Sequence, residues 1–212
     1  MTDVTDAYLD AAASAATLLA EPAVAAAWDK PSALAKFSVG GLAGHLAFQI
    51  LNVEPVLTGS PPNEPPIALL DHYASVRWVH VDLDDEINVS IRRSGEERAA
   101  GGPDELAATV AASVARLRTL LAATPGDRAV HLPWTGWALT IDDFLTTRML
   151  EITVHSDDLA VSVGIGAPEL PSRVLDPVLA LLTRLAVRRH GQTAVVRALS
   201  RAERAPATIA AI

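Results

Sequence analysis

The sequence predicts a mainly α-helical protein built on a four-helix bundle. Half of its 212 residues are hydrophobic and only 4% are aromatic, a composition that favours closely packed helices over a β-sandwich. Apolar residues recur at helical spacing in several long segments, whereas a single passage alternates as a strand does. The length suits one generous domain or two small ones.

The first half of the chain contains three helical patterns. The first covers about 3–20, and the second, about 38–54, begins at a Ser38 N-cap and is expected to end or kink at Pro55. After the proline-rich loop at 60–66, a long helical pattern runs from Ile67 to about Ala99.

The second half starts with a helix expected at 104–123. The passage 128–139 predicts a short β-hairpin or extended arm, since Thr135-Gly136 suits a turn. Thr140 and Asp143 have the spacing of a capping box that opens a helix over 140–164. Helices at about 171–190 and 193–203 follow. We therefore expect a bundle of 3–20, 38–54, 104–123 and 140–164 within residues 1–165, and a short helical extension, 166–212, packed on it.

Composition excludes several classes of function. The formal charge of −8 and the pI near 5.2 argue against a nucleic-acid partner. The absence of cysteine rules out disulfides, cysteine metal sites and a cysteine nucleophile. The first twenty residues lack the basic, uniformly apolar character of a signal peptide, and no uncharged run is long enough to span a bilayer. We expect a soluble, cytoplasmic protein.

The stretch "LEITVHSDDL" at 150–159 departs from the usual pattern of an amphipathic helix. On a helical wheel Arg148, Glu151, His155 and Asp158 fall within an arc of roughly 80°. Apolar residues such as Phe144 and Ile152 overlap or border that arc. These charged groups therefore interrupt the buried face. Burying a charge is costly unless it is paired, hydrogen-bonded or bound to a metal.

Two interpretations of this stretch are open. In the first, Arg148 pairs with Glu151 and His155 with Asp158, as a structural ladder at three-residue spacing. In the second, Glu151 and His155 direct a carboxylate and an imidazole at one cation. His45, at the edge of the apolar stripe in "GGLAGHLAFQ", is a third candidate ligand from a different helix, which is how bundles build metal sites. Taken alone, such a histidine is more often a core residue.

Two histidines and one carboxylate suit catalytic zinc with an open position, and they also match the ligand triad of non-haem ferrous iron. The other histidines carry less weight: His72 and His80 lie beside acidic residues, where a solvated face is expected. Trp134 and Trp137 flank the start of the ligand helix and are expected either to pack in the core or to shape a pocket.

Two segments, "SVGGLAGHLAFQ" and "LTIDDFLTTRMLEITVHSDDLAVSVG", resemble the signature segments of the mycothiol-dependent maleylpyruvate isomerase family, one of the DinB/YfiT-like metal-binding four-helix bundles. The shared patterns are Leu-x-x-His-Leu and Arg-x-x-Glu-x-x-x-His-x-x-Asp-Leu, and the resemblance covers about residues 5–165. Better-known members carry a distinct C-terminal domain, whereas about 50 residues follow Gly164 here. The resemblance therefore implies the fold and the metal site but not a particular substrate.

The resemblance implies that His45, Glu151 and His155 are metal ligands, most often for zinc, with nickel, iron or manganese as other divalent ions. It also implies that mycothiol is the thiol cosubstrate, and that Arg148 and Asp158 lie beside the site in catalysis. The hypothesis is a metal-dependent thiol transferase or isomerase that acts on a small electrophile. A homodimer is the oligomer that the resemblance suggests. The alternatives are a non-catalytic metal-binding bundle, such as a sensor or interaction module, and a scaffold that binds no metal.

Overall fold

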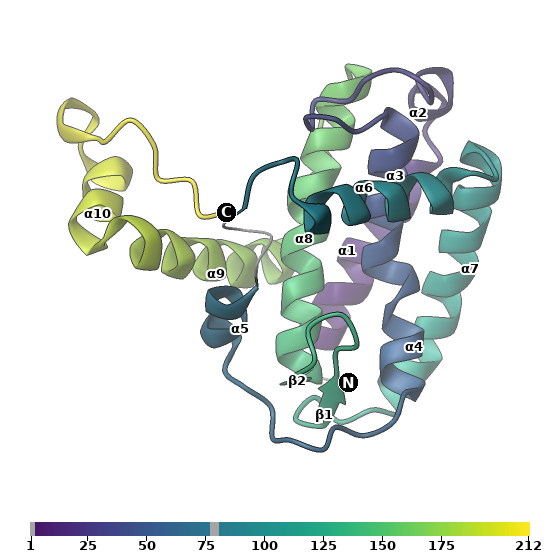
Figure 1. Ribbon diagram of the computed structural model, residues 1–212, viewed down its shortest axis with the longest axis horizontal. Coiled ribbons are helices and arrows are strands. Elements are labelled where there is room, and N and C mark those ends of the chain that lie inside the picture. The colour runs from purple at the N-terminus through teal and green to yellow at the C-terminus, as the bar shows by residue number, and fades with distance from the viewer. Residues whose placement is uncertain (1–2, 77–80) are drawn as a thin grey trace.

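Four long helices form the bundle that the sequence predicts (Figure 1). The computed structural model describes residues 3–76 and 81–212, and the bundle helices are α1 (Asp3–Leu19), α3 (Val39–Leu51), α7 (Pro103–Ala122) and α8 (Ile141–Val163). Each contributes a large, fully buried side chain to one core: Tyr8, Leu46, Leu117 and Phe144. The helical spacing of apolar residues that predicted these helices is thus the pattern of their packing.

Hydrogen-bonded caps delimit the two helices that carry the charged residues. Ser38 Oγ accepts a hydrogen bond from the Gly41 backbone N–H at the start of α3, and Thr140 Oγ1 accepts one from Asp143 N–H at the start of α8. Gly164, at φ 73°, ends α8 in a left-handed conformation that a glycine adopts without steric cost. Both predicted N-caps are confirmed.

The second bundle helix is interrupted three residues before Pro55, whereas the sequence placed its end or kink at the proline itself. The helix stops earlier, at the Asn52 C-cap, and a separate helix, α4 (Val53–Thr58), follows at once. Pro55 lies in the first turn of α4, where its missing N–H has no intrahelical partner to lose. A further short helix, α2 (Pro22–Ala26), precedes α3.

The predicted long helix from Ile67 to Ala99 is wrong. Its described parts form two separate helices, α5 (Leu69–Ser75) and α6 (Glu86–Ala99). Val76, after α5, is extended, and Asp85 caps a new helix by accepting a hydrogen bond from the Ile87 backbone N–H. The apolar residues keep helical spacing across the break, so their pattern alone does not indicate where α6 starts. The Asp85 N-cap does.

α6 lies across α3, as Figure 1 shows. The crossing is tight because glycines meet there: a Cβ atom on Gly44 would clash with the Gly95 carbonyl oxygen, and a Cβ on Gly95 would clash with the Gly41 carbonyl. Ser38 Oγ also donates a hydrogen bond to Glu96 Oε1 at 2.7 Å, which links the two helices at one end.

The predicted hairpin is present and precedes α8. Strands β1 (Ala129–His131) and β2 (Ala138–Thr140) pair antiparallel, with Val130 opposite Leu139. The backbone N–H of Ile67 donates to the Ala138 carbonyl at 3.0 Å, so the segment leading into α5 is bound to this hairpin.

Two helices follow the bundle, α9 (Ser172–His190) and α10 (Gln192–Ser200), with a 3₁₀ turn at Ala202–Arg204. α9 packs against α1 and α8 through one apolar face (Val174, Val178, Leu181, Leu185) and also contacts α5, while α10 lies at its far end (Figure 1). The division at residue 165 stays a prediction. Within the described residues, no helix is both long enough and apolar enough to cross a membrane.

Candidate metal centre

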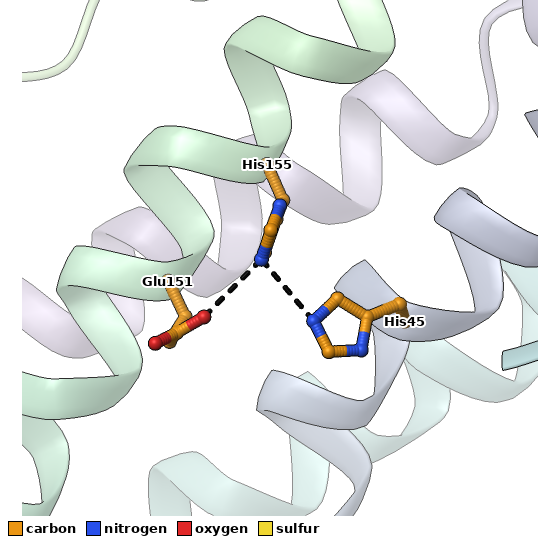
Figure 2. Close-up of side chains that lie close together, drawn as sticks. All are labelled: His45, Glu151 and His155. Carbon is orange, nitrogen blue, oxygen red and sulfur yellow. Dashed lines mark hydrogen bonds and ion pairs between the residues drawn. The ribbon is translucent and has the colours of Figure 1, made fainter. Parts of the chain in front are cut away.

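α3 and α8 bring His45, Glu151 and His155 together, as predicted (Figure 2). One nitrogen or oxygen of each side chain lies within 4.8 Å of the others. His155 Nε2 is 3.2 Å from Glu151 Oε2 and 3.1 Å from His45 Nε2, so it occupies the middle of the group. Glu151 and His155 are one helical turn apart on α8, and His45 faces them from α3.

Asp158 fixes the orientation of the His155 ring. Its Oδ2 atom accepts a hydrogen bond from His155 Nδ1 at 3.0 Å. An ionised carboxylate can only accept, so Nδ1 carries the proton and Nε2 is directed at Glu151 and His45. A carboxylate behind an imidazole in this way is the usual partner of a metal-binding histidine.

Burial and charge set the protonation of the three groups in the metal-free protein. Burial alone would raise the pKa of Glu151, but the hydrogen bond and charge of His155 outweigh it and hold that pKa at about 2. Burial would likewise lower the pKa of His155, yet Asp158 and Glu151 raise it to about 9. Burial, then the charge of His155, lowers the pKa of His45 to about 3. Without a metal, the group is a carboxylate, an imidazolium and a neutral imidazole.

Arg148 is buried beside these residues, with 7% of its surface exposed. Its Nε donates to Thr147 Oγ1 at 3.0 Å and its Nη1 to Gln49 Oε1 at 2.5 Å. Among the described residues it forms no ion pair with Glu151. The structural ladder inferred from spacing is therefore half present: His155 pairs with Asp158 as that interpretation requires, but Arg148 is bound to neutral groups.

Gln49 connects this arginine to the metal-ligand candidates. Its side-chain Nε2 donates to the His45 backbone carbonyl at 3.1 Å. The backbone carbonyl of Gln49 accepts a hydrogen bond from the Tyr8 hydroxyl at 3.2 Å. The side-chain oxygen of Gln49 is thus engaged with Arg148, and the Oδ2 atom of Asp158 with the Nδ1–H of His155.

The donor set fits a divalent transition metal. Two imidazole nitrogens and one carboxylate oxygen are the ligands of many catalytic zinc sites, which keep one position for water or substrate. The same set is found with ferrous iron, and imidazole also suits nickel. His45 and His155 could both coordinate through Nε2, the nitrogens that already face one another.

The expectation that His72 lies on a solvated face is wrong. The residue is buried, with 3% of its surface exposed. Its Nδ1 accepts a hydrogen bond from Trp137 Nε1 at 3.0 Å. Burial, then the charge of Arg148, lowers the pKa of His72 to about 4, so it is neutral. The residue next to it, Tyr73, has a buried hydroxyl that lacks a hydrogen-bond partner in the described structure. His80 lies outside the described residues.

Spacing along the chain gives no signal for the His72–Trp137 pair, because the two side chains come from α5 and the hairpin.

Two surface hollows in the described part of the chain lie away from His45, Glu151 and His155, one beside Asp82–Asp85 and one between Leu70 and Arg188. The three-residue group is thus recognised by its chemistry rather than by the shape of the surface.

Comparisons with known proteins agree with these observations. Residues 8–160 match the family model described as the mycothiol maleylpyruvate isomerase N-terminal domain. A crystal structure of a histidine-to-alanine mutant of the mycothiol-dependent maleylpyruvate isomerase is similar at 18% identity with a TM-score of 0.51, covering 89% of this chain and 75% of that one. At that identity the likeness shows the shared fold. No curated protein matches the chain. The family match covers most of the chain, which therefore belongs to the mycothiol maleylpyruvate isomerase N-terminal domain family.

Proposed function

We propose that this protein is a divalent-metal-dependent enzyme that uses a low-molecular-weight thiol of the mycothiol type to isomerise, or add to, a small electrophilic substrate. The observation that carries the proposal is the group of three ligand atoms, from two helices, within 4.8 Å of one another. Membership of the mycothiol maleylpyruvate isomerase N-terminal domain family supports the choice of thiol and of reaction. The lack of cysteine is consistent with a thiol supplied from outside.

His45, Glu151 and His155 would hold the metal. When bound, the metal would lower the pKa of an incoming thiol, so that a thiolate is available at neutral pH. Zinc suits this donor set best, and nickel, iron and manganese are the other ions to consider. The specific substrate follows from neither the donor set nor the fold.

The surrounding residues have distinct tasks in this proposal. Asp158 holds the His155 ring by its Nδ1–H, which keeps Nε2 pointed at the other two ligands. Arg148 is buried, and its hydrogen bonds within the described structure are to neutral oxygens, so it presents a guanidinium suited to a carboxylate of the substrate. Both were expected beside the site from the sequence.

Isomerisation by thiol addition and elimination needs no oxidant or reductant. The thiolate adds to a carbon–carbon double bond conjugated to a carbonyl, which forms a C–S bond and moves the π electrons onto the carbonyl oxygen. Rotation about the resulting single bond follows. Collapse of the enolate restores the double bond and expels the thiolate. A transferase would instead protonate the adduct and release it.

The hydrogen bonds of Gln49 and Asp158 favour this proposal over a non-catalytic metal-binding bundle. A purely structural site would close its coordination with a fourth protein ligand. Two polar side chains beside the group, Gln49 and Asp158, instead form hydrogen bonds with Arg148 and with Nδ1 of His155 respectively.

Metal content tests the proposal first. Protein purified without chelator should contain near-stoichiometric metal, which the double variant His45→Ala/Glu151→Ala should lose. His131→Ala, a histidine on β1 away from the group, is the matched control and should keep the metal. If neither the wild type nor the control binds metal while both are folded, the metal-dependent reaction is excluded.

A thiol-conjugation assay then tests the chemistry, with mycothiol or a simpler thiol and a conjugated enone as electrophile. His155→Ala should abolish both metal binding and metal-dependent adduct formation. Full metal content and full conjugation in that variant would remove His155 from the site and overturn the proposed assignment.

A further inference from the structure

The helices that follow the bundle carry a charge opposite to that of the rest of the chain. Residues 183–204, which comprise the second half of α9, α10 and the 3₁₀ turn, contain six arginines and one acidic residue, a formal charge of +5. The remaining residues contain 11 basic and 24 acidic side chains, a formal charge of −13. We call residues 183–204 the basic arm. Surfaces of opposite charge attract one another when two molecules meet.

The basic arm extends away from the bundle. α10 lies at the far end of α9, and its main contacts are with α9 and the 3₁₀ turn (Figure 1). Arg188 Nη1 donates to the Leu70 carbonyl at 2.8 Å, which holds the start of the arm against α5. Val195 is the residue that α10 buries. Most of the surface of α10 is therefore accessible to a partner.

α10 presents an apolar edge to solvent. Val196 and Leu199 are three residues apart, so they are neighbours on the helix surface, and 56% and 70% of their surfaces are exposed. Arg197 lies between them in the sequence, and Arg201 follows the helix. Neither arginine forms an ion pair with an acidic side chain of the described chain. Exposed apolar side chains beside arginines are a combination that protein interfaces favour.

A surface hollow before the start of α6 has the complementary character. Leu83 lies in this segment with 48% of its surface exposed. Arg92 Nη1 donates to the Leu83 carbonyl at 2.7 Å, and Lys36 pairs with Asp84, so the segment is held in place. Together with Glu86, the acidic residues of this segment outnumber these two cations. The residues that line the hollow are Val81, Asp82, Asp84 and Asp85.

The two surfaces do not meet within one molecule. No hydrogen bond or ion pair joins the basic arm to residues 81–86 in the described structure, and Figure 1 shows α10 and the start of α6 well apart. Two arms would repel one another, because each carries +5. The arm of one copy instead matches the hollow of another in charge and in apolar character. Such a contact can be made twice about a two-fold axis, which closes a dimer.

We propose that the basic arm docks in the acidic hollow at Asp82–Asp85 of a second copy of this chain, and that the second arm docks in the same way on the first copy. Val196 and Leu199 supply the apolar contact, and Arg197 and Arg201 supply the charge. The arm lies outside residues 8–160, which match the family model, so the contact depends on helices that the bundle does not include. It requires neither metal nor thiol and is independent of the proposed function.

Sedimentation equilibrium of the full chain at low and high salt tests the association. We expect a dimer whose dissociation constant rises about tenfold between about 50 mM and about 500 mM sodium chloride, because salt screens exposed charges. Arg197→Glu/Arg201→Glu should weaken the dimer at least about tenfold. So should Leu199→Lys, which keeps the positive charge of the arm and removes its apolar contact.

The matched control is Lys30→Glu/Arg118→Glu, which reverses two exposed cations of the bundle and changes the net charge by the same amount. This variant should not weaken the dimer. Because all the substituted side chains are exposed, the variants should fold, and circular dichroism checks this.

Exchange of charge between the two surfaces gives a sharper test. Asp82→Arg/Glu86→Arg reverses the charge of the hollow and should be monomeric alone, as the arm variant Arg197→Glu/Arg201→Glu should be. An equal mixture of the two variants should form a heterodimer, because each arm then meets a hollow of opposite charge.

A wild-type chain that stays monomeric at all concentrations overturns the proposal. If that monomer binds phosphatidylglycerol vesicles and Arg197→Glu/Arg201→Glu does not, the arm is a membrane-binding surface instead. A dimer that the arm variant leaves intact shows that the interface lies elsewhere. Failure of the two charge-reversed variants to associate when mixed excludes the hollow at Asp82–Asp85 as the surface that receives the arm.

Discussion

The protonation of His155 makes the stability of the metal-free protein depend on pH in a defined way. Its pKa is raised from 6.5 to about 9 in the folded chain, because the carboxylates of Asp158 and Glu151 hold the proton against the effect of burial. Each tenfold change in proton affinity is worth about 1.4 kcal/mol, so this proton stabilises the fold by about 3 kcal/mol. The contribution is fully present below pH 6.5 and is lost as pH rises to about 9.

His45 and His72 act in the opposite sense on the acid side. Their folded pKa values are lowered to about 3 and about 4, chiefly by burial, so the unfolded chain takes up these protons more readily as the pH falls below 6.5. The free energy of unfolding of chelator-treated protein should therefore be greatest near pH 6.5. Urea unfolding between pH 5 and pH 9.5 measures it. Asp158→Asn should flatten the decline on the alkaline side, because it removes one of the charges that hold the proton.

Metal binding should show the reverse dependence. A coordinating imidazole must be neutral, so the metal displaces the His155 proton. The apparent metal affinity should rise about tenfold per pH unit between pH 6.5 and 8.5. If the free energy of unfolding of the chelator-treated protein does not change between pH 6.5 and 9, the pKa of His155 is not raised. A metal affinity independent of pH in that interval would refute its assignment as a ligand.

Five substitutions, two of them comparison variants, test the packing of the fold by urea unfolding. Gly44→Ala should destabilise the fold by about 2 kcal/mol, because its Cβ would strike the backbone of α6, whereas Gly166→Ala, with open space around its Cβ, should be nearly neutral. Trp137→Phe should cost about 1 kcal/mol, as it removes the donor to a buried histidine. Tyr73→Phe should change stability by less than about 0.5 kcal/mol, since its hydroxyl has no partner, while Tyr8→Phe loses a buried hydrogen bond and should cost about 1 kcal/mol.

The bundle and the metal-ligand candidates could be predicted because both depend on local rules. Helical periodicity locates the four bundle helices, and serine and threonine caps mark the starts of α3 and α8. A helical wheel places Glu151 and His155 on one inward face. Because neighbouring bundle helices present their inward faces to one another, His45 was a candidate from a second helix before any contact was known.

What the sequence did not predict depends on contacts between distant segments. α5 and α6 were merged because the apolar residues keep helical spacing across the break, and the Asp85 cap was overlooked. The burial of His72 depends on Trp137 in a hairpin 65 residues away. The crossing of α3 and α6 depends on Gly44 and Gly95, and neither helix alone indicates its partner. In each case the deciding contact joins elements whose relative positions follow only from the assembled fold.

Charge balance connects the inward-facing residues with the proposed chemistry. In the metal-free protein the carboxylates of Glu151 and Asp158 are matched by the guanidinium of Arg148 and the imidazolium of His155, so the buried group is neutral overall. A divalent ion adds two positive charges and displaces one proton, which leaves one positive charge in excess. A buried site with such an excess favours one anion, as a thiolate or a carboxylate would be. The residues that make the metal-free fold self-sufficient are therefore those that would give the loaded site its preference for an anionic ligand.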